Sequence, residues 1–195
     1  MRLRLIAFLS YFVLGGFLLC ANAQNITDVK LFEFELGGGM TIGSNQGMLK
    51  SSPGLNMYLE ARTNLKDTPW DLGFQLGLGY MNRMDQNKTS YKVSNKFSMH
   101  AFIDYNFRCW DKIAPFAGIG LGRTELIYNT SGGVGEDGKQ SSYEQIFSPI
   151  VLNPRIGVEI FNHLRITAEY KMHFHNKCNW FALNLGYAFG GGKKR

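Results

Sequence analysis

The sequence predicts an all-β protein: one antiparallel, up-and-down transmembrane β-barrel of about eight strands, preceded by a cleaved N-terminal signal peptide. Three observations support this fold class. The first 23 residues have the three parts of a secretory signal. The rest of the chain has no long helical stripe and instead shows repeated alternation of apolar and polar residues. The connections between these alternating runs are short on one side and long on the other.

The N-terminus has the composition of an export signal. Arg2 and Arg4 form a basic start, an apolar stretch runs from Leu5 to Leu19, and Ala21-Asn22-Ala23 is a small-x-small cleavage site. We therefore assign residues 1–23 to a signal peptide, which implies export from the cytoplasm.

Residues 24–195 form the predicted barrel domain. Two alternatives are a retained N-terminal anchor and a lipoprotein acylated at Cys20. The apolar stretch is short for a spanning helix, and Leu19 is bulky where a lipoprotein signal has a small residue. Cys109 and Cys178 remain after cleavage, and the strand map places them at opposite ends of the barrel. We therefore predict two free thiols, because a disulfide needs Cα atoms within about 7 Å.

The clearest alternating run extends from Trp70 to Met81. One face is large and apolar, namely Trp70, Leu72, Phe74, Leu76, Leu78 and Tyr80. The other is polar or small, namely Asp71, Gly73, Gln75, Gly77, Gly79 and Met81. The same division recurs over residues 32–40, 55–62, 97–107, 113–121, 150–160, 164–174 and 181–189. Each run has about the length that a tilted strand needs to cross a bilayer.

Alternating strands also occur in soluble sandwiches and lipocalins, so the placement of the apolar face decides the class. Here the apolar faces are nearly free of charge, and the opposite faces carry glycines that fit a narrow lumen. The aromatic residues gather toward strand ends: Trp70, Tyr80, Phe97, Phe107, Phe174, Phe181 and Phe189. Two aromatic girdles flanking an apolar belt are typical of a barrel in the bacterial outer membrane.

The connections predict the orientation of the barrel. Three are short: Asn64–Pro69, Arg108–Lys112 and Asn162–His163. Three are long: Gly43–Pro53, Asn82–Ser94 and Glu125–Gln145. Short turns face the periplasm and long loops face outward in this class, so both chain termini are expected in the periplasm. The Gly- and Ser-rich segment Glu125–Gln145 is expected to be a mobile outer loop.

Two prolines fall inside the expected strands. A closed barrel has no edge strand on which proline is easily tolerated. We therefore expect Pro115 and Pro154 near strand ends or at β-bulges.

Three stretches identify a known architecture: Pro115–Gly122, Asn153–Glu159 and Phe181–Phe189. With them the chain resembles the small outer-membrane β-barrel domain family, the porin-superfamily relatives of outer-membrane proteins A and X. The resemblance covers the whole mature chain. It implies insertion by the outer-membrane assembly machinery, which recognises an aromatic-rich last strand. The chain departs from the common pattern because Phe189 is followed by a basic tail, Gly190–Arg195.

The inward faces carry many charges, and Glu35 and Asp71 are among them. We expect a structural network of interior ion pairs made by Glu33, Glu60, Arg62, Asp104, Arg155, Glu159, Arg165, Glu169 and Lys171. Buried charges must pair, and Arg155 and Glu159 face Glu169 and Arg165 on the hairpin partner. With the bulky inward residues Tyr58, Phe102 and Phe116, this network would plug the lumen. The alternative is a charged constriction in a small pore.

No catalytic constellation emerges. His173 and His175 share a face near a strand end, with His100 at a similar height, but no serine or acidic partner is set by spacing. Gly118-x-Gly120-x-Gly122 lacks the following helix of a phosphate-binding loop. We predict no catalytic residue, no metal and no cofactor.

The charge is mild. Removal of the two signal arginines lowers 21 basic residues to 19, against 15 acidic residues, a net charge of +4. Apart from Lys193-Lys194-Arg195 the basic residues do not cluster on one segment, which argues against a nucleic-acid partner. We predict a non-enzymatic, integral outer-membrane protein with a structural or partner-binding role. The alternatives are a small-solute pore and a lipid-modifying enzyme. The expected partners are outer-membrane lipid and lipopolysaccharide, the assembly machinery, and a protein bound through the loops.

Overall fold

The computed structural model describes residues 31–43, 53–65, 68–86, 89–107, 112–134, 140–174 and 179–190. These ranges contain nine β-strands. They are β1 Phe32–Gly43, β2 Gly54–Asn64, β3 Trp70–Gln86, β4 Thr89–Asn106, β5 Ile113–Val134, β6 Gln140–Phe147, β7 Ile150–Ile160, β8 Leu164–His173 and β9 Trp180–Phe189. No helix in the described part of the chain is long and apolar enough to cross a membrane.

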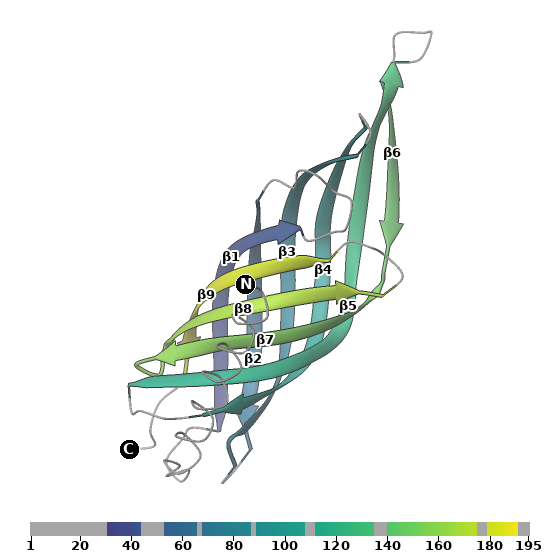
Figure 1. The fold of residues 1–195 in the computed structure, drawn as a ribbon. Helices are drawn as coiled ribbons and strands as arrows, with labels where there is room; N and C mark the ends of the chain where they lie inside the picture. Colours follow the sequence, from purple (N-terminus) through teal and green to yellow (C-terminus); the bar gives the residue numbers. More distant parts are fainter. Residues whose placement is uncertain are drawn as a thin grey trace, which may run out of the picture.

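The strands form one antiparallel sheet that closes on itself (Figure 1). Strands β1 to β5 pair in order, β5 also pairs with β7, and β7, β8 and β9 follow. The first and last strands, β1 and β9, pair through ten residue pairs and close the ring. The ring therefore has eight members, because β6 pairs with β5 alone among the described strands. This confirms the predicted eight-stranded antiparallel barrel.

The two ends of the barrel differ, and we name them by what they hold. The terminal end holds the start of β1 and the end of β9, since a ring with an even number of strands returns the chain to its starting side. It also holds the turn between β7 and β8, where Phe161 and Asn162 have positive φ values of 54° and 60°. The hairpin end holds the β3–β4 and β5–β6 hairpins, and the second rises far beyond the rest of the barrel (Figure 1).

Each strand has one face toward the interior and one face outward. Along β9 buried and exposed residues alternate without interruption, as the period of two in the sequence predicts. The outward apolar side chains of neighbouring strands form a continuous belt. Members with at least half of their surface exposed include Leu36, Leu59, Leu78, Leu121, Ile156 and Leu185. An apolar belt of this extent fits a lipid environment.

An aromatic row borders the belt at the terminal end. Trp70 packs edge-on against Tyr105, with 4.9 Å between ring centroids, and Tyr105 packs against Phe107 at 5.0 Å. On β9, Tyr187 packs against Phe189 with 4.9 Å between ring centroids. This row has the position expected of an interfacial girdle.

The predicted long loops at Asn82–Ser94 and Glu125–Gln145 are wrong for most of their length. Strands β3 and β4 continue through the first segment, and β5 and β6 continue through the second. The antiparallel ladder pairs the backbone groups of each hairpin within the segment itself, so the strands do not end where the apolar belt ends. The Gly- and Ser-rich composition of the second segment suggested a loop. Backbone pairing does not depend on side-chain type, so the composition gave no sign of it.

The two prolines have different outcomes. Pro115 is the third residue of β5, near a strand end as predicted. Pro154 lies in the middle of β7, and the prediction of a strand end or bulge is wrong there. The β7–β8 ladder omits two pairs, Asn153 with Lys171 and Pro154 with Tyr170, and resumes in unchanged register at Arg155 with Glu169. Proline has no N–H to donate, so the ladder tolerates it as a local gap.

Several predictions concern residues outside the described ranges. These are the signal peptide over residues 1–23, the two thiols of Cys109 and Cys178, the position of His175, and nearly all of the basic tail.

Candidate functional site

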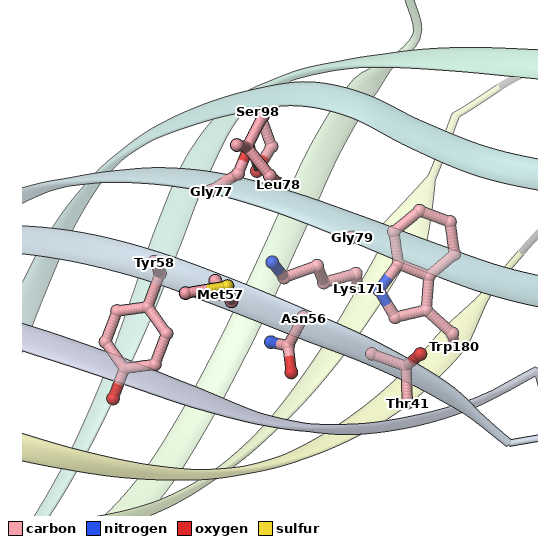
Figure 2. A pocket seen from close by; sticks show the side chains of 10 residues that line it. All are labelled: Thr41, Asn56, Met57, Tyr58, Gly77, Leu78, Gly79, Ser98, Lys171 and Trp180. Carbon is pink, nitrogen blue, oxygen red and sulfur yellow. Dashed lines mark hydrogen bonds between the residues drawn. The ribbon is translucent and has the colours of Figure 1, made fainter.

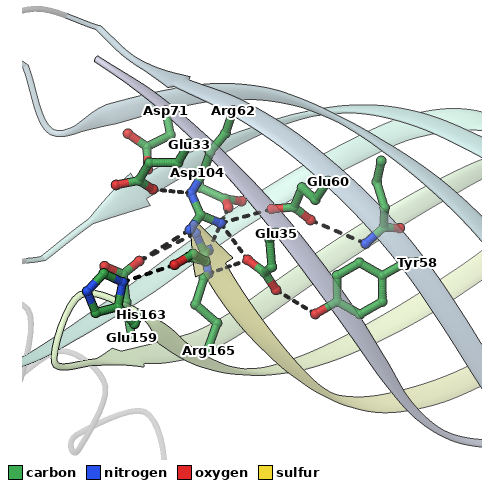
Figure 3. Close-up of polar contacts among 12 residues, drawn as sticks. Glu33, Glu35, Tyr58, Glu60, Arg62, Asp71, Asp104, Glu159, His163 and Arg165 are labelled. Carbon is green, nitrogen blue, oxygen red and sulfur yellow. Dashed lines mark hydrogen bonds and ion pairs between the residues drawn. The ribbon is translucent and has the colours of Figure 1, made fainter. Parts of the chain in front are cut away.

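The charged side chains predicted for the interior all lie on inward faces of the strands. All are buried except Glu159, which is partly exposed. Glu35 and Asp71 join them on the same faces. Figure 3 shows how the carboxylates gather around arginines contributed by different strands. The arrangement is a layer of charge that begins near the terminal end and reaches the middle of the barrel.

Arg62 on β2 lies at the centre of the carboxylates near the terminal end. Its Nε lies 2.6 Å from Glu33 Oε2, and its Nη1 lies 2.7 Å from Glu35 Oε2. The same Nη1 lies 3.2 Å from Glu60 Oε1, and Nη2 lies 3.5 Å from Glu159 Oε2. One guanidinium therefore joins carboxylates from β1, β2 and β7.

Arg155 and Glu60 cross the full width of the barrel. Arg155 Nη1 donates to Glu60 Oε2 at 2.9 Å, and Nη2 donates to Glu60 Oε1 at 3.0 Å. Four steps along the ring separate their strands, β7 and β2, in either direction, so the two strands face each other. Paired hydrogen bonds between a guanidinium and a carboxylate are among the strongest side-chain contacts. This contact spans the lumen at its level.

Two arginines also lie over aromatic rings. The guanidinium carbon of Arg155 lies 4.2 Å from the ring centre of Phe102, and that of Arg165 lies 3.8 Å from Phe116. Arg165 Nη2 lies 3.2 Å from Asp104 Oδ2. Ring faces attract cations, so the bulky inward aromatics both fill space and hold the guanidinium groups.

Glu169 organises the middle of the lumen. It accepts hydrogen bonds from Gln75 Nε2 at 3.0 Å and from Asn153 Nδ2 at 3.4 Å. Lys171 Nζ lies 3.7 Å from Glu169 Oε2, the oxygen that accepts from Asn153. Gln75 is on β3, which lies opposite β8 in the ring, so this is a second contact across the diameter. Asp71 is held differently, by an amide hydrogen bond from Asn106 at 2.5 Å.

The register places a glycine opposite each bulky inward aromatic. Tyr58 pairs with Gly37, Phe102 with Gly73, and Phe116 with Gly157. A Cβ at any of these glycines would collide with the ring of its partner. The sequence indicated small inward residues. It did not identify these glycine–aromatic pairs, because they depend on the register between neighbouring strands.

Two of the candidate histidines, His100 and His173, lie inside the barrel, away from lipid. His100 is 1% exposed and His173 is 6% exposed, and the His173 ring tilts against Trp180 with 4.2 Å between centroids. Across the described part of the chain, no group of three acidic, histidine or cysteine side chains is arranged to hold a metal ion.

A small cavity of about 10 Å³ lies toward the hairpin end, above the charged layer. Figure 2 shows Lys171 pointing into it, with Thr41, Asn56, Tyr58 and Trp180 around it. Its volume holds about one water molecule. The interior therefore has little free space above the charged layer at this position.

Comparisons with known proteins bear on the fold. No protein family model matches the chain, and no curated protein is similar to it in sequence. Among solved structures, Neisserial surface protein A is 17% identical with a TM-score of 0.53, and the match covers 83% of this chain and 98% of that one. Ail of Yersinia pestis, solved with the heparin analogue sucrose octasulfate, is 13% identical with a TM-score of 0.49, covering 84% and 99%. The outer membrane enzyme PagL is 16% identical with a TM-score of 0.40, covering 80% and 98%.

The first of these likenesses supports the fold, and it agrees with the closed ring and the apolar belt described above. The resemblance found in the sequence is thereby confirmed at the level of architecture. The chain has the fold of the small eight-stranded outer-membrane β-barrels.

Proposed function

We propose that this protein is a non-enzymatic outer-membrane barrel with a structural or partner-binding role, and that buried ion pairs seal its lumen. The observation that carries the proposal is the contact of Arg155 with Glu60 across the barrel at 2.9 and 3.0 Å. A conducting pore needs a continuous water path, and this pair occupies the middle of it.

The surrounding contacts support a seal. Gln75 and Glu169 span the neighbouring diameter from β3 to β8, and Arg62 reaches Glu159 from β2 to β7 at 3.5 Å. These groups lie on rigid strands, so their separation is set by the ring itself. Truncating one partner of such a buried pair leaves an uncompensated charge, which costs about 3–5 kcal/mol.

The partner-binding role belongs to the hairpin end. We place the terminal end in the periplasm and the hairpin end outside the cell, because outer-membrane barrels have short periplasmic turns. The β3–β4 and β5–β6 hairpins then present a projecting sheet to lipopolysaccharide or to a protein. Insertion by the outer-membrane assembly machinery fits the aromatic β9, which ends in Tyr187 and Phe189.

The positions of the histidines favour a non-enzymatic role over a lipid-modifying one. An enzyme acting on lipid needs a base and a nucleophile at the lipid-facing surface. His100 and His173 face the interior and are buried there. Lipid A of unchanged composition after overexpression would agree with this reading, and a new lipid species lost in His173→Ala would overturn it.

Single-channel conductance of the refolded mature chain in a planar bilayer tests the seal. We expect no steady current from barrels whose insertion is shown by a heat-dependent shift in gel mobility. Reproducible conductance steps would mean that water passes the Arg155–Glu60 pair, and a small-solute pore would replace the proposed function. A change of those steps in Arg155→Ala would place the constriction at this pair.

A further inference from the structure

Arg123 is an outward-facing cation on a surface that is otherwise apolar. It lies on β5 two residues beyond Leu121, which is strongly exposed in the apolar belt, and next to Thr124, which is fully buried. Arg123 itself is exposed. Among the outward strand residues whose side chains the structure describes, it is the one cation. A charge on the lipid face is unfavourable unless it meets a counter-charge or polar groups.

The height of Arg123 coincides with the hairpin-end border of the belt. It pairs in register with Ile150 on β7, and Phe174 after β8 donates its backbone N–H to the Ile150 carbonyl at 2.9 Å. Phe174 is half exposed, and exposed aromatic residues mark the level where acyl chains meet headgroups. The guanidinium of Arg123 therefore emerges at headgroup level.

The contacts of Arg123 leave most of its donors available. Nη2 reaches the Ser148 carbonyl oxygen at 3.3 Å, and no carboxylate within the described ranges forms an ion pair with Arg123. A guanidinium has five N–H donors, so several remain for a ligand. Glu125, the next outward residue along β5, is engaged by a contact of its own.

The wall strand is interrupted beside this arginine. Ser148 and Pro149 separate β6 from β7, and the ladder is held there by a hydrogen bond of 3.2 Å from Thr124 N to the Pro149 carbonyl. Ser148 is exposed, and its carbonyl oxygen accepts from Arg123. Exposed Ile146 and Ile150 lie on either side of the break. The polar contact of Arg123 with the Ser148 carbonyl is thus bordered by exposed apolar side chains.

We propose that Arg123 binds the phosphate group of an outer-leaflet lipid, while the acyl chains of that lipid lie on the belt below. A phosphate matches the planar donor fork of arginine, and a phosphorylated lipid supplies both the anion for Arg123 and the acyl chains for the apolar side chains around it. The apolar floor is formed by Leu121, Met99 and Ile150, whose side chains are all well exposed. The proposal rests on the proposed orientation with the hairpin end outside, and it does not depend on whether the lumen conducts.

Native mass spectrometry of the folded chain tests it. The protein is reconstituted with lipid A, extracted mildly, and examined for bound lipid, with lipid A lacking its phosphates as the matched ligand. We expect one retained phosphorylated lipid on the wild type and about tenfold lower retention on Arg123→Gln. Arg123→Lys keeps the charge but not the fork, so it should fall between them.

Lys112 provides the control, because it is an exposed cation at the terminal end. Lys112→Gln should retain the lipid as the wild type does, and each variant must show the heat-dependent gel shift of a folded barrel. Equal retention by Arg123→Gln and the wild type would overturn the site. Loss of the bound lipid in Lys112→Gln alone would overturn both the site and the proposed orientation. The conductance test of the lumen would be unaffected by that result. Displacement by millimolar inorganic phosphate would show a soluble-anion site and would also overturn a lipid site.

Discussion

Single residues inside the barrel are matched by size across neighbouring strands. Phe102 lies over Gly73, and a Cβ at Gly73 would come within 2.6 Å of Phe102 Cε2. The ring in turn lies under the Arg155 guanidinium. A change at one glycine therefore displaces an aromatic ring and then an ion pair. Packing and electrostatics are coupled here at the level of one side chain.

Gly73→Ala is expected to destabilise the barrel by about 1–3 kcal/mol, because an overpacked ring must leave its position. Urea unfolding in lipid vesicles, followed by tryptophan fluorescence, measures the loss. Gly120→Ala is the matched control, since a Cβ there has only ordinary contacts of 3.4–3.5 Å. Equal midpoints for both variants would show that Phe102 moves aside without cost.

The crossing pair gives a second prediction at this scale. Glu60→Ala should cost about 3–5 kcal/mol, since the buried Arg155 loses the carboxylate that accepts both of its short hydrogen bonds. Glu60→Ala combined with Arg155→Ala should cost less than the sum of the single changes, because the double variant has no stranded charge at this pair. Additive losses in the same unfolding assay would mean that the pair is not coupled.

Among the elements, the turn between β7 and β8 is the strained one. Phe161 has φ of 54°, a conformation that bulky residues rarely adopt, while Asn162 tolerates its φ of 60°. The turn is held by a hydrogen bond of 3.2 Å from His163 N to the Ile160 carbonyl, and Phe161 N donates to the Lys112 carbonyl at 2.8 Å. The neighbouring backbone thus fixes a conformation that the sequence does not favour.

Phe161→Asn with Asn162→Gly should stabilise the barrel by about 1 kcal/mol, because Asn and Gly adopt a positive φ at lower cost than the residues they replace. The urea midpoint should rise, and Asn162→Gly alone should change it less. A lower midpoint for the double change would show that the exposed ring of Phe161 contributes more through its contact with the membrane than its backbone costs.

For the whole molecule, the apolar belt sets where charge is tolerated. Leu59 lies midway along β2, and Ile42 lies one residue from the end of β1, paired with Phe181 of the hairpin-end border. Both are more than half exposed. Depth in the membrane therefore distinguishes two otherwise similar positions.

Leu59→Arg is expected to cost about 2–4 kcal/mol and Ile42→Arg about 0–1 kcal/mol, because the cost of a lipid-facing arginine falls toward the interface. Unfolding in vesicles measures both variants. A larger loss of stability for Ile42→Arg than for Leu59→Arg would contradict the placement of the belt. Equal small losses would argue against a membrane around this surface.

The whole-molecule fold was largely predictable because a period of two assigns inward and outward faces residue by residue. Along β8, for example, Arg165, Glu169 and Lys171 were placed inward by alternation alone, and the structure has them there. The Arg155–Glu60 contact was not predictable in this way. It joins strands that are distant in sequence and opposite in the ring, so it depends on how the sheet closes.

Other errors have local causes. The β5–β6 hairpin was taken for a loop because glycine and serine lower strand propensity, although backbone pairing still extends the ladder. Pro154 was expected at a bulge because a proline interrupts a ladder, but a single missing donor leaves the register of β7 and β8 unchanged.

The β1–β9 seam has a consequence for biogenesis. Its ten residue pairs join the beginning of the barrel to its end, so the wall cannot be completed until the final strand has been delivered. Until that moment both outermost strands offer unpaired backbone groups, which invite aggregation or capture. A nascent chain truncated anywhere before β9 therefore cannot close its sheet. Its two edge strands keep their unpaired backbone groups, and a chaperone or protease can bind them.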